Sequence, residues 1–272
     1  MKGRRRAARL IMVAAMAAGW LGAGAAWPRP AVPGHHGPEV PAAAVRGAPV
    51  RGAPVRGAAV AGPAVRGARA AVAQTRACAV GVCRRGMPAG RDLRATQQPQ
   101  LTGYFCGPAT VSEMLAQMGK RVSQRQAAAE LGTTTSGTGW SDLDSDPVPA
   151  VLNENQRRND YQAVGLPWAP TRPQLRAYER DLVTDINYRG GVPLAGDAYE
   201  VPGGPHLVGH PLNQTIYHWF DIRGYQEYGS LTDYEDSVHN ASSIGWAASV
   251  PGYSSLPSAT IVTIVGARGY DW

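Results

Sequence analysis

Aromatic side chains are almost confined to one part of this 272-residue chain. Of its Trp, Tyr and Phe residues, only Trp20 and Trp27 precede residue 96. A folded core needs large apolar side chains, so residues 96–272 are predicted to form the folding unit. Charge divides at the same place, because residues 1–95 carry 16 of the 27 Lys and Arg but 2 of the 20 Asp and Glu. The folding unit is acidic in composition, so the basic pI does not indicate a nucleic-acid partner.

Residues 1–26 have the three parts of a secretory signal peptide. Basic residues between Lys2 and Arg9 precede the apolar run Leu10–Leu21, and small residues follow at Ala23–Ala26. The run is shorter than the roughly 20 residues that span a bilayer, which favours cleavage over a retained anchor. The protein is therefore expected to be secreted, extracellular or associated with the cell wall, with no membrane span after signal cleavage.

Residues 27–95 have low complexity. The sequence VRGAP and close variants of it repeat with a five-residue period from Val45 to about Ala68. Such a segment cannot bury enough apolar surface to offset its chain entropy, so we predict a disordered tether or pro-segment. Its evenly spaced arginines leave three interpretations open: a solubilising spacer, a pro-segment, or a charged arm that binds anionic cell-wall polymers or lipid headgroups.

The chain contains three cysteines. Cys78 and Cys83 are close enough in sequence to form a disulfide that closes a small loop, and Cys106 would then have no disulfide partner. A leftover thiol in a secreted protein is a candidate reactive group. The alternative is that Cys106 pairs with one of the other two cysteines and attaches the tether to the domain.

The sequence around Cys106 predicts the start of a buried helix. Apolar residues recur at helical spacing from residue 111 to residue 118, and Gly107 and Pro108 suit a first helical turn. Cys106 therefore lies at the predicted helix N-terminus. The positive end of the helix dipole favours a thiolate there, and the thiolate is the nucleophilic form of cysteine.

The segment from Gln100 to Ala109 resembles the nucleophile region of papain-like cysteine peptidases. Gln100, five further residues and then Cys106-Gly107-Pro108-Ala109 are most similar to the bacteriocin-leader-processing group, cysteine-peptidase family thirty-nine and its free-standing secreted relatives. The resemblance implies an α+β papain-like fold, in which a helical part that carries the nucleophile packs on a C-terminal antiparallel sheet. It also implies that the Gln100 side chain contributes to the oxyanion hole, that a His and an Asp follow downstream, and that no metal or organic cofactor is needed.

His218 is the predicted general base among six histidines. It lies in a predicted strand over residues 216–225, where alternation places it on the same face as Phe220. A lone histidine on an apolar face is more often structural, but the pattern H-x5-G-Y here resembles the histidine strand of this peptidase group. His206 and His210 lie in a loop rich in Gly and Pro.

The two loop histidines also raise the alternative of a zinc site. Asp197 or Glu200 could complete it, but the segment lacks the helical H-E-x-x-H frame. We therefore predict no metal ligands.

Asp236 is the predicted third catalytic residue. Strands are expected over residues 192–199, 216–225 and 231–238, and a hairpin centred near residue 227 places residue 236 opposite residue 218. Asp236 also matches the family position. Asp221 is expected on the opposite face, and Asp233 is the alternative if the register differs.

Other elements are predicted from local signals. Ser123 and Thr171 each begin a capping box followed by a helical pattern. The apolar segment 258–265 fits either a helix or a strand.

These residues together predict a secreted thiol-dependent peptidase. Cys106, His218 and Asp236 would hydrolyse a peptide or protein substrate through a thioester. Two alternatives stay open: the same triad could act on cell-wall peptides as an amidase or transpeptidase, or the chain could be a catalytically silent exported binding module in which Cys106 forms a disulfide.

Overall fold

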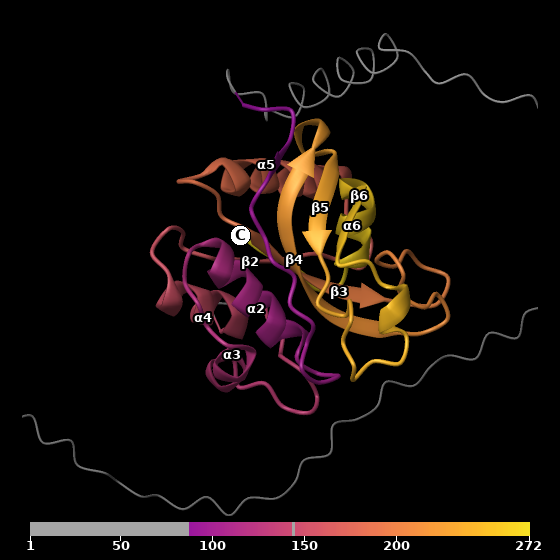
Figure 1. Cartoon of the computed structure of the whole chain (residues 1–272). Coiled ribbons are helices and arrows are strands. Elements are labelled where there is room, and N and C mark those ends of the chain that lie inside the picture. Colours follow the sequence, from indigo (N-terminus) through magenta and orange to yellow (C-terminus); the bar gives the residue numbers. More distant parts are fainter. Residues whose placement is uncertain (1–86, 143–144) are drawn as a thin grey trace, which may run out of the picture. The chain divides into compact units, whose positions relative to one another are not determined.

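The computed structural model of the chain describes residues 87–142 and 145–272 (Figure 1). The predicted signal peptide, most of the predicted tether, and Cys78 and Cys83 lie outside the described residues. Residues 87–95 were predicted as part of the tether, and this boundary is wrong. Strand β1 (Arg91–Asp92) pairs with the central sheet, and Leu93 is buried in the core. Buried Leu93, the short ladder with β4 and further hydrogen bonds, such as that from the Tyr228 N–H to the Ala89 carbonyl, attach this segment to the domain.

The described residues contain one antiparallel sheet with the strand order β2-β7-β3-β4-β5-β6 (Figure 1). Strand β1 pairs with β4 off this path. The bounds of the strands are β2 Ala163–Gly165, β3 Leu194–Glu200, β4 Ile216–Gln226, β5 Leu231–Glu235, β6 Tyr253–Pro257 and β7 Gly269–Asp271. The three predicted strands correspond to β3, β4 and β5, although β5 ends before residue 236.

Helices cover both faces of the sheet, so the mixed α+β class is confirmed. The nucleophile region forms α2, followed by α3 and α4 beside the sheet, while α5 and α6 pack with its other face (Figure 1). The bounds are α2 Cys106–Gln117, α3 Gln124–Glu130, α4 Pro147–Asn155, α5 Arg172–Asn187 and α6 Ser258–Ile264, with short 3-10 turns at Glu227–Gly229 and Ala247–Ser249. None of the described helices is long and apolar enough to cross a bilayer.

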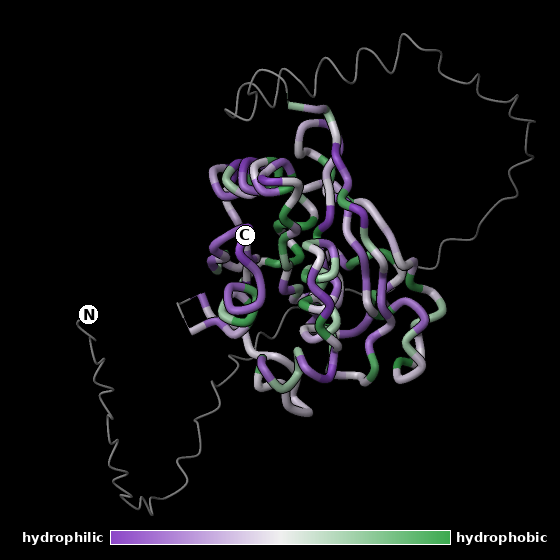
Figure 2. The backbone as a smooth tube through the Cα atoms, turned by 60° about the vertical axis from the view of Figure 1, so that its left-hand side comes forward, coloured by the Kyte–Doolittle hydropathy of each residue, from purple (hydrophilic) through white to green (hydrophobic). Residues whose placement is uncertain are grey.

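Alternation along β4 divides the core into two apolar clusters. Trp219 packs with Val111 and Met114 of α2, whereas Phe220 packs with Tyr178 of α5 and with α6. Figure 2 shows the hydrophobic stretches gathered between the helices and the sheet. One face of the sheet therefore fixes the position of α2, and the other face packs against α5 and α6.

Capping side chains explain where several helices begin. The Ser123 side chain accepts a hydrogen bond from the backbone N–H of Gln126 at 3.2 Å, as predicted. The backbone N–H of Thr171 donates to Gln174 Oε1 at 2.8 Å, which is one half of the predicted capping box. Helix α4 was not predicted, although Asp146 caps it through a hydrogen bond from the Val148 N–H at 2.9 Å. The undecided segment 258–265 is mostly helix α6.

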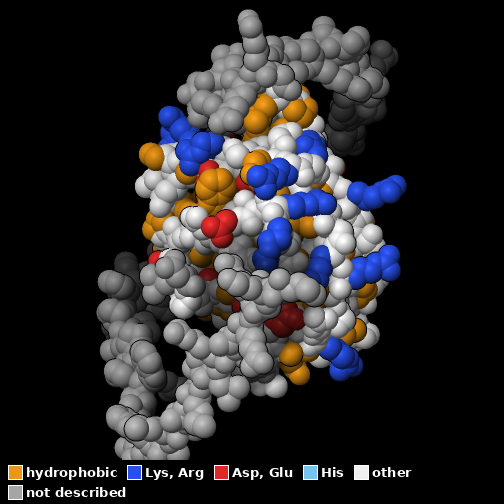
Figure 3. All heavy atoms as spheres, turned by 90° about the vertical axis from the view of Figure 1, so that its left-hand side faces the viewer, with side chains coloured by type: hydrophobic (Ala, Val, Ile, Leu, Met, Phe, Trp, Pro, Cys, Tyr) orange, Lys and Arg blue, Asp and Glu red, His pale blue; other side chains and the backbone are white. Residues whose placement is uncertain are grey.

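The charged side chains at the surface do not reflect the acidic composition of the folding unit. Twelve Asp and Glu side chains are buried among the described residues, whereas no Lys or Arg of the same residues is buried. Lys and Arg side chains are spread over the face shown in Figure 3. The acidic composition of residues 96–272 is therefore a poor guide to the charge that a partner would meet.

Candidate active site

Cys106 is the first residue of helix α2. The helix is held in place because its apolar side chains, including Val111 and Met114, are fully buried in the cluster that contains Trp219. Cys106 itself is free and retains 9% of its exposed surface, which it directs into a cavity of about 680 Å³. The thiol is thus fixed at the positive end of a core helix and open to a cavity.

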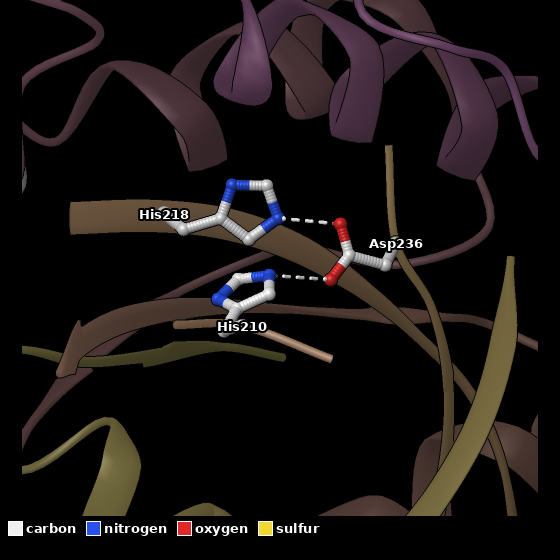
Figure 4. A group of neighbouring side chains, drawn as sticks. All are labelled: His210, His218 and Asp236. Atoms are coloured by element: carbon white, nitrogen blue, oxygen red, sulfur yellow. Dashed lines mark hydrogen bonds and ion pairs between the residues drawn. The ribbon is translucent and has the colours of Figure 1, made fainter. Parts of the chain in front are cut away.

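His218 lies on strand β4, beside Cys106 at the start of α2. Its Nε2 is 3.0 Å from Asp236 Oδ1, and its ring also interacts with the Cys106 side chain, which leaves Nδ1 for the thiol (Figure 4). Burial alone would lower the pKa of His218, but the carboxylate of Asp236 and the Cys106 thiol outweigh this and raise the pKa well above its usual value. The site therefore favours an imidazolium next to the thiol.

A β-bulge in β4 explains how Asp236 reaches His218. The pairing of β4 with β5 shifts by one residue at Arg223, and beyond it Asp221 pairs with Glu235. Because side chains alternate between faces, the shift brings Asp236 rather than Glu235 to the face of His218. The predicted register, with residue 236 directly opposite residue 218, is wrong. Continued pairing would place Asp236 opposite Phe220, which makes His218 a diagonal neighbour within reach of its side chain.

His210 continues the hydrogen-bonded series beyond Asp236 (Figure 4). Its Nε2 lies 2.9 Å from Asp236 Oδ2, and its Nδ1 lies 2.8 Å from Glu200 Oε2, with both partners buried. Burial alone would lower the pKa of His210, but Asp236 and Glu200 raise it. Conversely, although burial alone would raise the pKa of Asp236, the two histidines hold it below its usual range. Asp236 is therefore a carboxylate shared by two histidines.

The sequence interpretation missed this role of His210, because it treated the residue as part of an irregular loop. The only signal was a pair of histidines next to prolines, which suggested zinc. The four residues of that alternative do not come together: His206 contacts the backbone carbonyls of Gly204 and Gln214, and Asp197 pairs with Arg268. Only Glu200 and His210 are in contact.

Two groups of described residues could offer three ligand atoms to a metal ion within 4.8 Å of one another: His210, His218 and Asp236, and separately Glu113, Asp221 and Glu235. In the first group each Nε2 is bound to its own oxygen of Asp236, so hydrogen bonds already satisfy these atoms. The first group is therefore best described as a hydrogen-bonded series.

Gln100 is buried beside the site but does not line the cavity. Its Nε2 donates to the Thr102 carbonyl at 2.7 Å, and its Oε1 accepts from Ser237 Oγ at 3.2 Å. The Gln100 backbone N–H donates to the Ser237 carbonyl at 2.8 Å. These bonds connect the segment before the nucleophile to the residue that follows Asp236, and a role in the oxyanion hole stays a prediction.

The loop over residues 132–140 forms one wall of the cavity. It packs closely on α2, because a Cβ at Gly107 would lie 2.3 Å from Thr138 Oγ1. The Trp219 indole N–H also donates to the Thr138 carbonyl at 3.4 Å. Gly107 is therefore needed for this close approach, which places the loop next to Cys106.

Three buried carboxyl groups lie between α2 and the sheet, two helical turns from Cys106. Gln117 Nε2 donates to Asp221 and, at 3.0 Å, to Glu235 Oε1, while one oxygen each of Glu113, Asp221 and Glu235 has no partner. Burial raises the pKa of all three, and Glu235 raises those of Asp221 and Glu113 further. Like charges so close cannot all ionise at low cost, so the native state retains protons there.

We expect the substitution Asp221→Asn to stabilise the protein at alkaline pH. A raised carboxyl pKa in the folded state costs stability as pH rises above about 4, and the amide removes this cost. The melting temperature of the variant should exceed that of the wild type by a few degrees near pH 8, with the difference vanishing near pH 4. Asp160→Asn, at an exposed position, is the matched control. An identical pH dependence in Asp221→Asn and the wild type would contradict the expectation.

Comparison with known proteins leaves the family open. The chain matches no family model, and no curated protein is significantly similar to it. One solved structure with a similar arrangement is a protein from Bacillus anthracis described as C39-like peptidase, at 11% sequence identity and a TM-score of 0.40, covering 65% of this chain and 92% of that one. A similarity at this score carries no functional argument, so the chemistry of the site is inferred from its own residues.

Proposed function

We propose that the protein is a secreted thiol-dependent peptidase of the papain-like type. Cys106 would be the nucleophile, His218 the general acid and base, and Asp236 the residue that orients the imidazole. The observation that supports this most directly is the continuous series from the Cys106 thiol through His218 to Asp236, which opens on a cavity of about 680 Å³. Nucleophile, base and orienting group in contact are the signature of covalent catalysis.

The proposed reaction follows from these contacts. The Cys106 sulfur, deprotonated by His218, attacks the carbonyl carbon of the substrate and forms a tetrahedral oxyanion. The Cys106 backbone N–H, with the Gln100 amide in the role its resemblance implies, would stabilise that oxyanion. His218 then gives its proton to the leaving amine as the C–N bond breaks, and a water molecule deprotonated by His218 hydrolyses the thioester.

Asp236 would act by holding His218 in one tautomer. Since Nε2 of His218 is bound to Asp236, the Nδ1 atom is the one that exchanges protons with the thiol and the leaving amine. His210, which is itself bound to Glu200, holds the other oxygen of Asp236 and so limits the rotation of the carboxylate.

A peptide-library digest tests the proposed activity. The mature protein should cleave extended peptides, and prior treatment with iodoacetamide should abolish cleavage in proportion to alkylation of Cys106, measured by peptide mapping. Purified peptidoglycan, digested in parallel, separates a general peptidase from the cell-wall amidase or transpeptidase alternative. Peptide mapping that finds Cys106 in a disulfide with Cys78 or Cys83 would contradict the proposal and favour the silent binding module.

A further inference from the structure

A row of aromatic rings leads away from the cavity that contains Cys106. Tyr217 lines this cavity next to His218, and its ring stacks on that of Tyr199 with centroids 4.7 Å apart and an angle of 7° between the planes. Tyr199 in turn meets Trp168 edge to face at 5.3 Å. The three rings are therefore continuous.

The far end of this row opens on a second, smaller cavity of about 190 Å³. This cavity lacks charged lining residues among those the structure describes; its walls are Trp168, Tyr199, Val201, Gly204, Pro205, Thr263 and Gly266. It is smaller than sites that bind whole small molecules, which usually exceed about 300 Å³. Its size and walls suit a single bulky apolar side chain.

Two of the three rings are exposed although they are apolar, and Tyr199 is half-buried. Trp168 and Tyr217 each retain 57% of their exposed surface, and neither belongs to an apolar core cluster. Tyr199 and Tyr217 are direct partners in the ladder of β3 and β4, and the guanidinium of Arg268 lies 5.2 Å over the Tyr217 ring. The sheet thus holds the Tyr199 and Tyr217 rings in fixed positions, and Trp168 packs edge to face on Tyr199, as a binding platform requires and folding does not.

We propose that this row is a substrate-binding strip, and that the smaller cavity receives an aromatic or branched aliphatic side chain of the peptide. The proposal rests on the peptidase function proposed above, because the strip is continuous with the catalytic cavity. An extended peptide advances about 3.3 Å per residue, so ring-to-ring steps of 4.7 and 5.3 Å correspond to at most about three residues between Tyr217 and Trp168. The selected side chain therefore lies at a fixed position away from the scissile bond.

The charges near the strip explain why the selected side chain is apolar. Asp197 and Arg268 form an ion pair at the border of the catalytic cavity, where Tyr217 also lies, so their charges already have partners. A charged side chain in the smaller cavity would lose its hydration and gain no partner among the residues that line it. Burial in the smaller cavity is therefore more favourable for an aromatic or aliphatic side chain than for a charged one.

Digestion of a random library of extended peptides by the full-length mature protein tests the strip. Cleavage by the wild type should show enrichment of aromatic and branched aliphatic residues at one fixed position away from the cut. Trp168→Ala should lower kcat/KM for the enriched peptides about 10-fold, mainly through KM, and leave short substrates that do not reach the smaller cavity unaffected. The matched control is Leu212→Ala, an equally apolar truncation at a residue 69% exposed that lines neither cavity.

A binding measurement separates failure of the strip from failure of the peptidase function. If the wild type cleaves peptides without this preference, or if Trp168→Ala keeps it, the strip is overturned while the peptidase function stands. If the wild type cleaves no peptide, the peptidase function fails, and affinity selection of the same library on the Cys106→Ala variant decides about the strip. The strip is supported if Cys106→Ala selects apolar peptides and the Cys106→Ala, Trp168→Ala double variant does not. It is overturned if Cys106→Ala shows no apolar enrichment.

Discussion

Replacement of Cys106 by serine is expected to lower kcat for peptide hydrolysis by about 10⁴-fold or more. Serine keeps the size of the side chain but is a far weaker nucleophile near neutral pH, because its hydroxyl is not ionised there. His218 and Asp236 would remain hydrogen-bonded, so the fold around the site should be preserved. Steady-state kinetics with a peptide identified in the library digest, together with the melting temperature of the variant, checks this expectation.

The same exchange at the other cysteines is the matched control. Cys78→Ser and Cys83→Ser should retain near wild-type kcat, because the proposed mechanism uses only the thiol at the start of α2. Substantial hydrolysis by Cys106→Ser would show that Cys106 is not the nucleophile. Loss of activity in all three variants would point to a structural role for the thiols.

The nucleophile helix could be predicted because its signals are local. The apolar stripe of α2 and the glycine and proline of its first turn depend on residues a few positions apart, as does the cap of the next helix, α3, at Ser123. The position of Cys106 at the helix N-terminus follows from the same short segment. Long-range packing then only had to bury a face that the sequence already defines.

The partner of His218 was identified with an incorrect register. The hairpin was expected to pair regularly about residue 227, whereas β4 and β5 shift by one residue at Arg223. Asp236 was nevertheless the right neighbour. The one-residue shift at the bulge places it on the same face of the sheet as His218, which is the face that the regular pairing about residue 227 had assumed. A bulge leaves no clear trace in a single sequence, since any residue in an alternating strand can be the extra one.

The roles of His210, Glu200 and the buried carboxyl groups could not be predicted. Composition suggests that Asp and Glu lie at the surface, yet twelve of them are buried in the described part of the chain. Their burial depends on partners in other parts of the fold, such as Glu200 of β3 with His210 of the following loop and Gln117 of α2 with Asp221 of β4. Hydrophobic periodicity reports which face is apolar and gives no information on such polar contacts across elements.

Asp236→Asn is expected to lower kcat by about 10- to 10³-fold. The amide can still occupy the site, but it does not stabilise the imidazolium of His218 and it can hold the ring in the wrong tautomer. Asp233→Asn is the matched control, because Asp233 lies on β5 three positions away, is equally buried, and is bound to Gln226 and Ser255 instead of a histidine. If Asp233→Asn lowers kcat and Asp236→Asn does not, Asp236 is not the third catalytic residue.

The pH dependence of stability gives Asp236 a second test that does not require turnover. The pKa of Asp236 is held below its usual range, so its contribution to stability is present above about pH 4 and is lost as pH falls. The pKa values of His218 and His210 are raised, so their contributions are present below about pH 6.5 and are lost as pH rises through the folded-state values. The loss of unfolding free energy in Asp236→Asn should therefore be largest between about pH 4 and 6.5, at roughly 3 kcal/mol, and smaller on either side. Denaturant unfolding across this pH range measures it, and a loss independent of pH would mean that Asp236 does not carry the charge that holds the two histidines.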